Sequence, residues 1–322
     1  MGWARIAAGL LLLLALALGI GALGLEFHRE LRAQHQRVQS GSSLLRTACG
    51  DIEIAESGPA GAPVLLLLHG SGGGFDQGLM LGRSLAPQGV RVIAPSRFGY
   101  LRSPFPADAS GEHQADHLAC LLDALGLPDA AVMGVSAGAV SALHFAVRHP
   151  QRTRALVLMV PAVYRPDPAV PMPAWGLRLL DAAVSADLPF WLLARLAPAS
   201  ARQLVLATPP EAYAAATADE QRRADAMLAL IQPVSRRRLG LLNDSRLTTG
   251  AARVALESIR APTLCISARD DGFGTWESAQ YSCQHIPGAR FLGFDTGGHL
   301  MLGRRAEVVA EVTALLREPA TR

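Results

Sequence analysis

The sequence contains no lysine, and all 30 of its basic residues are arginine. P-loop phosphate binding, Schiff-base catalysis and pyridoxal phosphate chemistry each need a lysine amine, so the composition excludes these three classes. Charge is also sparse, because charged residues make up 18% of the chain and the formal net charge is +3. The only run of three basic residues lies at 236–238, and we interpret it as a solvated face. We therefore expect no nucleic-acid partner.

Cysteine is scarce too, and its spacing is uninformative for metal or redox chemistry. The chain has four cysteines, which stand far apart and form no C-x-x-C pair: Cys49, Cys120, Cys265 and Cys283. This argues against a zinc site or a dithiol centre, and buried free thiols are our first interpretation, with disulfides left open. His113 and His117 lie one helical turn apart, but no third ligand stands near them, so we interpret them as solvated. We expect neither a metal nor a cofactor.

The N-terminal segment is an unbroken apolar run over residues 6–25, long enough to cross a bilayer as a helix. Arg5 precedes the run, and charged residues follow it from Glu26 onward. A cleaved signal usually has a shorter apolar region, so we favour an uncleaved membrane anchor over residues 1–25. A removed signal, which would release an exported soluble form, stays open. Arginines flank both ends of the run, so the side of the membrane is undecided. We predict that the polar residues 26–43 form a linker.

Beyond the linker, short apolar runs alternate with helical periodicity, which predicts an α/β sheet with helices on both faces. Eight strands are predicted, the first two as a hairpin: residues 44–48, 52–56, 64–68, 90–94, 130–134, 155–160, 263–267 and 289–294. The interval 161–260 breaks the alternation, because it is rich in proline and alanine and has no convincing strand. We interpret it as a helical cap inserted into a core made of residues 44–160 and 261–318.

The pentapeptide 134–138 (G-V-S-A-G) joins an apolar run to an amphipathic helix. A serine hydroxyl is a weak nucleophile at neutral pH, so a fold that uses one presents it at a sharp strand-to-helix turn within reach of a base. Gly134 and Gly138 suit the points where the two arms of such a turn pass close together. We therefore predict that Ser136 is a nucleophile.

A glycine-rich turn, residues 69–74 (H-G-S-G-G-G), follows the strand at 64–68. Backbone N–H groups in such a turn can point at a negative oxygen. The spacing does not match the G-x-G-x-x-G dinucleotide pattern, so we predict an oxyanion hole. Its donors would be the N–H of Ser71 or Gly72 and the N–H of Ala137, which follows the nucleophile. We expect His69 to shape the turn and not to take part in chemistry.

Two later strand ends carry an acid and a base. Asp270 and Asp271 follow one strand, and His299 follows another. The carboxyl ends of parallel strands meet at one edge of a sheet, where sites are assembled. An unperturbed histidine has a pKa near 6.5, which suits a base, and a carboxylate can fix its tautomer. The residues alone leave the two aspartates in competition for that role.

These motifs, in the order serine, acid and histidine, resemble the α/β-hydrolase superfamily in its single-chain, helical-cap branch, over about residues 44–316. The resemblance implies an eight-stranded, mostly parallel sheet with the nucleophile after the fifth strand and the cap after the sixth. It also implies an acid three residues past a small residue at a strand end, which from Ala268 selects Asp271 over Asp270. Relatives commonly have an aspartate after the fourth strand, where this chain has Ser96. The role of the loop 96–103 in substrate binding is therefore open.

The resemblance implies a serine hydrolase that cleaves a carboxylic ester of a partly apolar small molecule through an acyl-enzyme, and the apolar N-terminal run adds the expectation that it is membrane-anchored. Ser136 would attack, His299 would carry the proton and Asp271 would orient His299. One alternative is hydrolysis of a carbon–carbon bond in a vinylogous diketone by the same residues. Another is a catalytically silent binding module at the membrane. A serine nucleophile argues against the relatives that attack with aspartate, the haloalkane dehalogenases and epoxide hydrolases.

Overall fold

The computed structural model describes residues 2–167 and 172–318, which fall into two units that divide after Ser40. The first unit is a single helix, α1 (Gly2–Ser40), and the polar residues predicted as a linker continue it to its end. Its apolar part has a mean hydropathy of 2.6 over 18 residues, none of them buried. This helix is long and apolar enough to span a membrane, although a signal sequence has the same properties.

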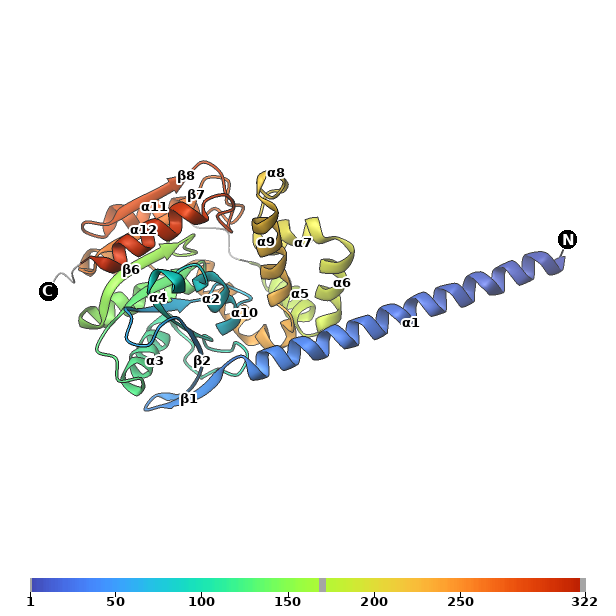
Figure 1. Cartoon of the computed structure of the whole chain (residues 1–322), viewed down its shortest axis with the longest axis horizontal. Helices are drawn as coiled ribbons and strands as arrows, with labels where there is room; N and C mark the ends of the chain where they lie inside the picture. Colours follow the sequence, from blue (N-terminus) through green and yellow to red (C-terminus); the bar gives the residue numbers. More distant parts are fainter. Residues whose placement is uncertain (1, 168–171, 319–322) are drawn as a thin grey trace. The chain divides into compact units, whose positions relative to one another are not determined.

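The second unit contains the eight-stranded sheet that the sequence predicts (Figure 1). Its strands are β1 (Ser43–Thr47), β2 (Gly50–Ser57), β3 (Val64–Leu68), β4 (Arg91–Pro95), β5 (Ala130–Val135), β6 (Thr153–Met159), β7 (Thr263–Ala268) and β8 (Arg290–Phe294). They lie in the order β1-β2-β4-β3-β5-β6-β7-β8. β1 pairs antiparallel with β2, which pairs antiparallel with β4, and every other pairing is parallel. The predicted fold class is therefore confirmed.

Helices cover both faces of this sheet because side chains of a strand alternate between the faces. In β3, Leu66 and Leu68 enter one hydrophobic core, which also contains residues of α3 (Gly111–Ala124), α4 (Gly138–Arg148) and α11 (Thr275–His285). Leu65 and Leu67 enter the other core, against α12 (Arg305–Arg317) and part of α2 (Phe75–Gly82). Both faces being buried, the strand is apolar throughout its length.

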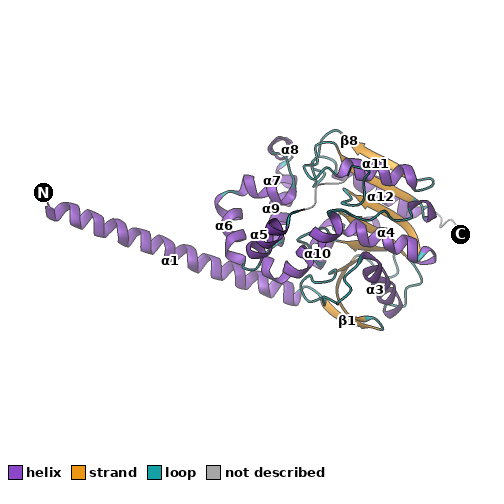
Figure 2. Ribbon diagram, turned by 180° about the vertical axis from the view of Figure 1, so that it is seen from behind, coloured by secondary structure: helices purple, strands orange, loops and turns teal. Residues whose placement is uncertain are grey.

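Between β6 and β7 the chain forms helices, as the predicted cap requires; residues 168–171 of that interval lie outside the described residues. The helices are α5 (Ala174–Val184), α6 (Asp187–Leu196), α7 (Pro198–Leu206), α8 (Pro210–Ala215), α9 (Ala218–Leu230) and α10 (Arg238–Thr248). Four 3₁₀ turns complete the described elements: η1 (Ala86–Gln88), η2 (Pro150–Arg152), η3 (Val234–Arg237) and η4 (Leu256–Ser258). Helices α5 to α9 gather at one side of the sheet (Figures 1 and 2). They share a separate hydrophobic core with Leu300 and Leu302, from the turn after β8.

A disulfide joins Cys49, in the turn between β1 and β2, to Cys120 on α3, with 6.0 Å between their Cα atoms. Cys265 and Cys283 are free thiols, and Cys265 is buried. Our first interpretation of all four cysteines as free is wrong for the first pair. The hairpin places Cys49 over α3, and the sequence does not reveal this proximity because the two cysteines are 71 positions apart.

We expect the double variant Cys49→Ala/Cys120→Ala to lose about 2–5 kcal/mol of unfolding free energy, because the cross-link no longer restricts the unfolded chain. Urea unfolding followed by circular dichroism measures this loss. Dithiothreitol should lower the midpoint of the wild type and of Cys283→Ala but leave the double variant unchanged. Equal midpoints of the wild type with and without reductant would contradict the disulfide.

Candidate active site

The turn between β5 and α4 holds Ser136 in a strained backbone conformation. Its φ angle is 52°, in the left-handed region that side chains other than glycine rarely adopt. The Ser136 N–H donates to the carbonyl of Met159 (3.0 Å), and its own carbonyl accepts from Ala139 (3.0 Å) and Ala162 (3.1 Å). These three hydrogen bonds hold the predicted nucleophile at the carboxyl end of β5.

Close backbone contacts explain the two glycines of the pentapeptide. A Cβ on Gly134 would lie 2.5 Å from the Cα of Ala139, and one on Gly138 would lie 2.3 Å from the carbonyl oxygen of Leu68. Both distances exclude any side chain, as the sequence predicts. A Cβ on Gly70 would lie 3.1 Å from that of Ser136, so the glycine-rich turn runs directly beside the serine.

His299 and Asp271 are brought together by the ends of β8 and β7. His299 Nδ1 lies 2.8 Å from Asp271 Oδ2, and the Phe273 ring packs edge-on against the imidazole with 4.8 Å between centroids. Asp271 also accepts hydrogen bonds from the Thr275 hydroxyl and from the Phe273 N–H, the latter at 2.9 Å. With the carboxylate bound to Nδ1–H, Nε2 is left as the basic nitrogen.

Electrostatics keep Asp271 ionised. Burial raises the pKa of this carboxyl, but the charge and hydrogen bond of His299 and the donors Thr275 and Phe273 outweigh burial, so its pKa lies below the usual range. A buried carboxylate in this state stabilises an imidazolium next to it.

The neighbouring Asp270 has a different set of contacts. Its carboxylate accepts from the backbone N–H of Gly297 (3.1 Å) and Gly298 (2.8 Å), the two residues before His299. Of the two aspartates that compete in the sequence, Asp271 is the one hydrogen-bonded to the histidine ring. Asp270 instead braces the turn that carries His299.

The glycine-rich turn has the shape expected of an anion cradle. Gly72 has a φ of 74°, and the Gly73 N–H closes the turn on the Gly70 carbonyl (3.1 Å). The Gly72 N–H donates to the Tyr100 hydroxyl (3.3 Å). Within the part of the chain that the structure describes, the N–H groups of Ser71 and Ala137 make no hydrogen bond. Of the predicted upstream donors, Ser71 is therefore better placed than Gly72.

His69 lies wholly inside the protein at the start of this turn. Its Nδ1 lies 2.8 Å from the Gly70 carbonyl and its Nε2 accepts from the Arg97 N–H (3.0 Å). Burial, and then the charge of Arg97, lower the pKa of His69 well below its ordinary value. The ring is thus neutral, and its contacts tie it to the backbone of the turn and to Arg97.

Two buried ion pairs beside the turn could not be foreseen. Arg97, in the loop after β4, pairs with Asp244 of α10, and Arg237 of η3 pairs with Asp76 of α2. Arg237 is 0% exposed, so the prediction of a solvated face at 236–238 is wrong for it. Its guanidinium also donates to the carbonyls of Gly73, Leu230 and Ile231, which replace the lost water. The paired residues are more than 140 positions apart in sequence, so no local pattern reveals them.

His117 is also not the solvated residue that the sequence suggests. It is buried against the Phe98 ring, 5.1 Å between centroids, and burial lowers its pKa. Among the described residues, no group of three metal-ligating side chains comes together.

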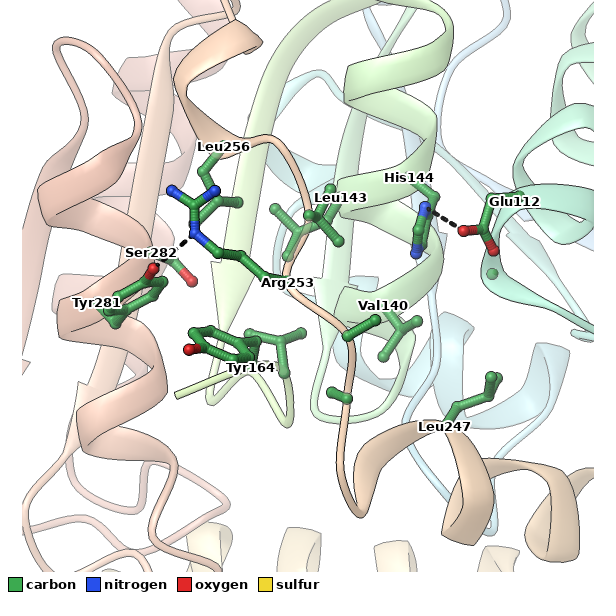
Figure 3. A pocket seen from close by; sticks show the side chains of 15 residues that line it. Glu112, Val140, Leu143, His144, Tyr164, Leu247, Arg253, Leu256, Tyr281 and Ser282 are labelled. Atoms are coloured by element: carbon green, nitrogen blue, oxygen red, sulfur yellow. Dashed lines mark hydrogen bonds and ion pairs between the residues drawn. The ribbon is translucent and has the colours of Figure 1, made fainter. Parts of the chain in front are cut away.

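A separate cavity of about 110 Å³ lies beside α4 and α11 (Figure 3). Val140, Leu143 and His144 of α4 line one side, and Tyr164 and Tyr281 line the other. A cavity of about 150 Å³ holds one benzene molecule, so this one takes only a small apolar group. We therefore do not place the substrate there.

A family model described as the alpha/beta hydrolase fold matches residues 63–303. The chain belongs to this family.

Curated relatives include hydrolases of 2-hydroxy-6-oxononadienedioate and 2-hydroxy-6-oxononatrienedioate. The chain is 37% identical to that of Paraburkholderia xenovorans (strain LB400) over 150 residues, 44% of this chain and 52% of the relative, so it spans about half of that protein. It is 30% identical to the enzyme of Paraburkholderia phymatum over 262 residues, 77% and 84% of the two chains. Among solved structures, an alpha/beta hydrolase fold protein from Nakamurella multipartita has a TM-score of 0.67 and 28% identity, over 86% of this chain and 99% of that one.

We expect Asp271→Asn to lower kcat for ester hydrolysis by about 10³- to 10⁴-fold, because an amide stabilises neither the tautomer nor the imidazolium. Asp270→Asn, one residue away and equally isosteric, should cost no more than about tenfold, since it only loosens the turn before His299. Initial rates on p-nitrophenyl butyrate measure both, with thermal unfolding as a check of folding. A larger loss in Asp270→Asn would reverse the two assignments.

Proposed function

We propose that the chain is a serine hydrolase that cleaves the carboxylic ester of an uncharged, partly apolar small molecule. The observation that carries this proposal is the buried His299–Asp271 pair, 2.8 Å apart, at the sheet edge where the strained Ser136 turn also lies. Leu68 and Gly134 are partners across β3 and β5, so the glycine-rich turn starts at the same edge. Nucleophile, base, acid and anion cradle are the parts that acyl transfer needs.

In this proposal the Ser136 hydroxyl oxygen attacks the ester carbonyl while its proton passes to His299 Nε2. The Ala137 and Ser71 N–H groups hold the oxyanion, and Asp271 stabilises the imidazolium. Collapse of the tetrahedral intermediate breaks the bond to the alcohol, which takes the proton from His299. Water then attacks the acyl-enzyme by the same route and releases the acid.

The charges around the turn favour an uncharged substrate. Arg97 and Arg237 are the cations that touch the glycine-rich turn, and each is neutralised by a buried aspartate. A carboxylate on the substrate would gain little from an arginine already paired in this way. An ester without a second charge does not need such a partner.

Hydrolysis of a carbon–carbon bond is the second candidate, because both curated relatives described above are named for oxo-dienedioate substrates. The same serine and histidine would serve that reaction. A catalytically silent binding module is the third hypothesis, and it predicts turnover of neither substrate.

We expect a fluorophosphonate probe to label the wild type, and the label and p-nitrophenyl ester hydrolysis to be lost by more than about 10³-fold in Ser136→Ala. Ser141→Ala removes a buried serine on α4, the helix that follows the Ser136 turn; it is the matched control and should keep both. Turnover of short esters without turnover of a ring-cleavage diketone supports the ester proposal, and the reverse supports the second candidate. Unlabelled, inactive wild type would leave only the silent module.

We further propose that α1 anchors the protein in a membrane, with the catalytic unit on the exported side. The support is the apolar composition of α1 together with the Cys49–Cys120 disulfide, since structural disulfides persist in oxidising compartments and are rare in the cytosol. Arginines at both ends of the apolar run give the positive-inside rule no preferred orientation, so the disulfide is the observation that supports the exported side.

In bacteria expressing the full chain, intact protein should stay in the membrane pellet after an alkaline wash, and protease added to spheroplasts should digest the catalytic unit. Without reductant, a maleimide should leave Cys49 and Cys120 unmodified. A mature N-terminus near Leu25 would overturn the anchor, and protection from protease would overturn the exported side.

A further inference from the structure

We propose that Asp244, on cap helix α10, is a positioning residue for the oxyanion hole, acting through Ser71 and Tyr100. This rests on the proposed ester hydrolysis, in which the Ser71 N–H is one of the two oxyanion donors. The consequence is that the cap supplies part of the geometry of the catalytic centre, in addition to covering it.

Asp244 is 2% exposed, and its carboxylate accepts hydrogen bonds from residues outside the cap. Oδ1 accepts from one Arg97 nitrogen (2.7 Å) and Oδ2 from the other (2.6 Å). Oδ2 also accepts from the Tyr100 hydroxyl (2.6 Å) and the Ser71 hydroxyl (3.0 Å). Four donors and one opposite charge offset the cost of burying this carboxylate.

Ionisation within this cluster is well defined. Burial lowers the pKa of Arg97, but the charge and hydrogen bonds of Asp244 raise it more, and the guanidinium stays charged. Burial and then the charge of Asp244 raise the pKa of Tyr100 well above its usual value. Tyr100 therefore keeps its proton, which it donates to Asp244, while its oxygen accepts the N–H of Gly72.

The cluster holds two consecutive residues of the turn. The Ser71 side chain bonds to Asp244 directly, and the Gly72 N–H reaches it through the Tyr100 hydroxyl. Because the Gly72 N–H is occupied, the Ser71 N–H is left to face the substrate. The Ser71 N–H belongs to the peptide that joins Gly70 to Ser71, and the carbonyl of that peptide accepts from the Gly73 N–H (3.1 Å). The bonds of the Ser71 side chain and the Gly72 N–H hold the chain directly after this peptide, so the network restricts the direction of the oxyanion donor.

A second cap residue holds the next position of the turn. Arg237 donates to the Gly73 carbonyl and pairs with Asp76 at 2.7 Å. The two ion pairs have opposite polarity. In one the arginine lies in the core and the aspartate in the cap, and in the other the aspartate lies in the core and the arginine in the cap. The cap segment 237–244 therefore bonds Ser71 and Gly73 directly and Gly72 through Tyr100, and displacement of the segment would loosen all three.

A network that merely stabilises the cap would affect all substrates alike, so the test compares an ester with its thionoester. The oxygen of an ester gains more from an oxyanion hole than the larger, weakly accepting sulfur of a thionoester. Loosening the hole should lower kcat for the ester with little change in KM, and lower the ratio of ester to thionoester rates.

The variants are Ser71→Ala and Tyr100→Phe, each of which removes one attachment and leaves the Arg97–Asp244 pair intact. Each should lower kcat for the ester about 10- to 100-fold, change KM less than threefold and lower the ester-to-thionoester ratio at least threefold. Ser245→Ala is the control and should match the wild type, since among residues 2–167 and 172–318 its hydroxyl bonds only within α10, to the Leu241 carbonyl at 3.0 Å. Asp244→Asn should be at least as severe, but it unbalances a buried charge, so thermal unfolding must accompany it.

Wild-type kcat in both Ser71→Ala and Tyr100→Phe, or an equal loss on ester and thionoester, would overturn the role of Asp244 while leaving the hydrolase intact. Ester turnover that survives Ser136→Ala would instead overturn the proposed function. If the wild type turns over no ester but is labelled by a fluorophosphonate, the labelling rate replaces kcat, because the phosphonyl oxygen occupies the same hole. Unchanged labelling rates in both variants would then overturn the inference.

Discussion

The sharp backbone turn at Ser136 is the constraint on which the rest of the site depends. A serine with φ of 52° persists only because its surroundings over-determine it. At Gly134 and Gly138 the backbone lies so close to α4 and to the end of β3 that no side chain fits. The packing that permits the turn also seats Gly70 beside the serine. One steric requirement thus positions both Ser136 and the glycine-rich loop beside it.

Two buried ion pairs connect the cap to this loop, so the same contacts neutralise the buried charges and fix the conformation of the loop. A buried pair adds little net stability, because desolvation offsets attraction, but its directional bonds specify one arrangement. Arg97–Asp244 and Arg237–Asp76 are bonded in this way to residues 71–73, directly or through Tyr100. The position of the cap and the conformation of the glycine-rich turn are therefore not independent of each other.

The two adjacent aspartates, Asp270 and Asp271, make different contacts. Asp271 faces the ring of His299, whereas Asp270 bonds the backbone before that histidine. Position along the chain alone left both aspartates as candidates, and resemblance to the family favoured Asp271. In the structure Asp271 bonds the imidazole, and Asp270 makes a bracing contact that no motif indicates. Asp271 and His299 thus lie on two neighbouring turns that hydrogen bonds hold together.

Most of the sheet and the nucleophile turn could be predicted because they depend on neighbouring residues: apolar runs specify strands, and a G-x-S-x-G turn requires its own two glycines. The linker predicted at 26–43 is instead helical as far as Ser40, because its Glu, Arg, Gln and Leu residues are good helix formers whatever their polarity. By itself, the sequence determined the order of the elements and the chemistry available at the strand ends. Only the tertiary structure decided the disulfide, the burial of Arg237 and the partner of Arg97, because packing alone brings together groups so distant in the chain.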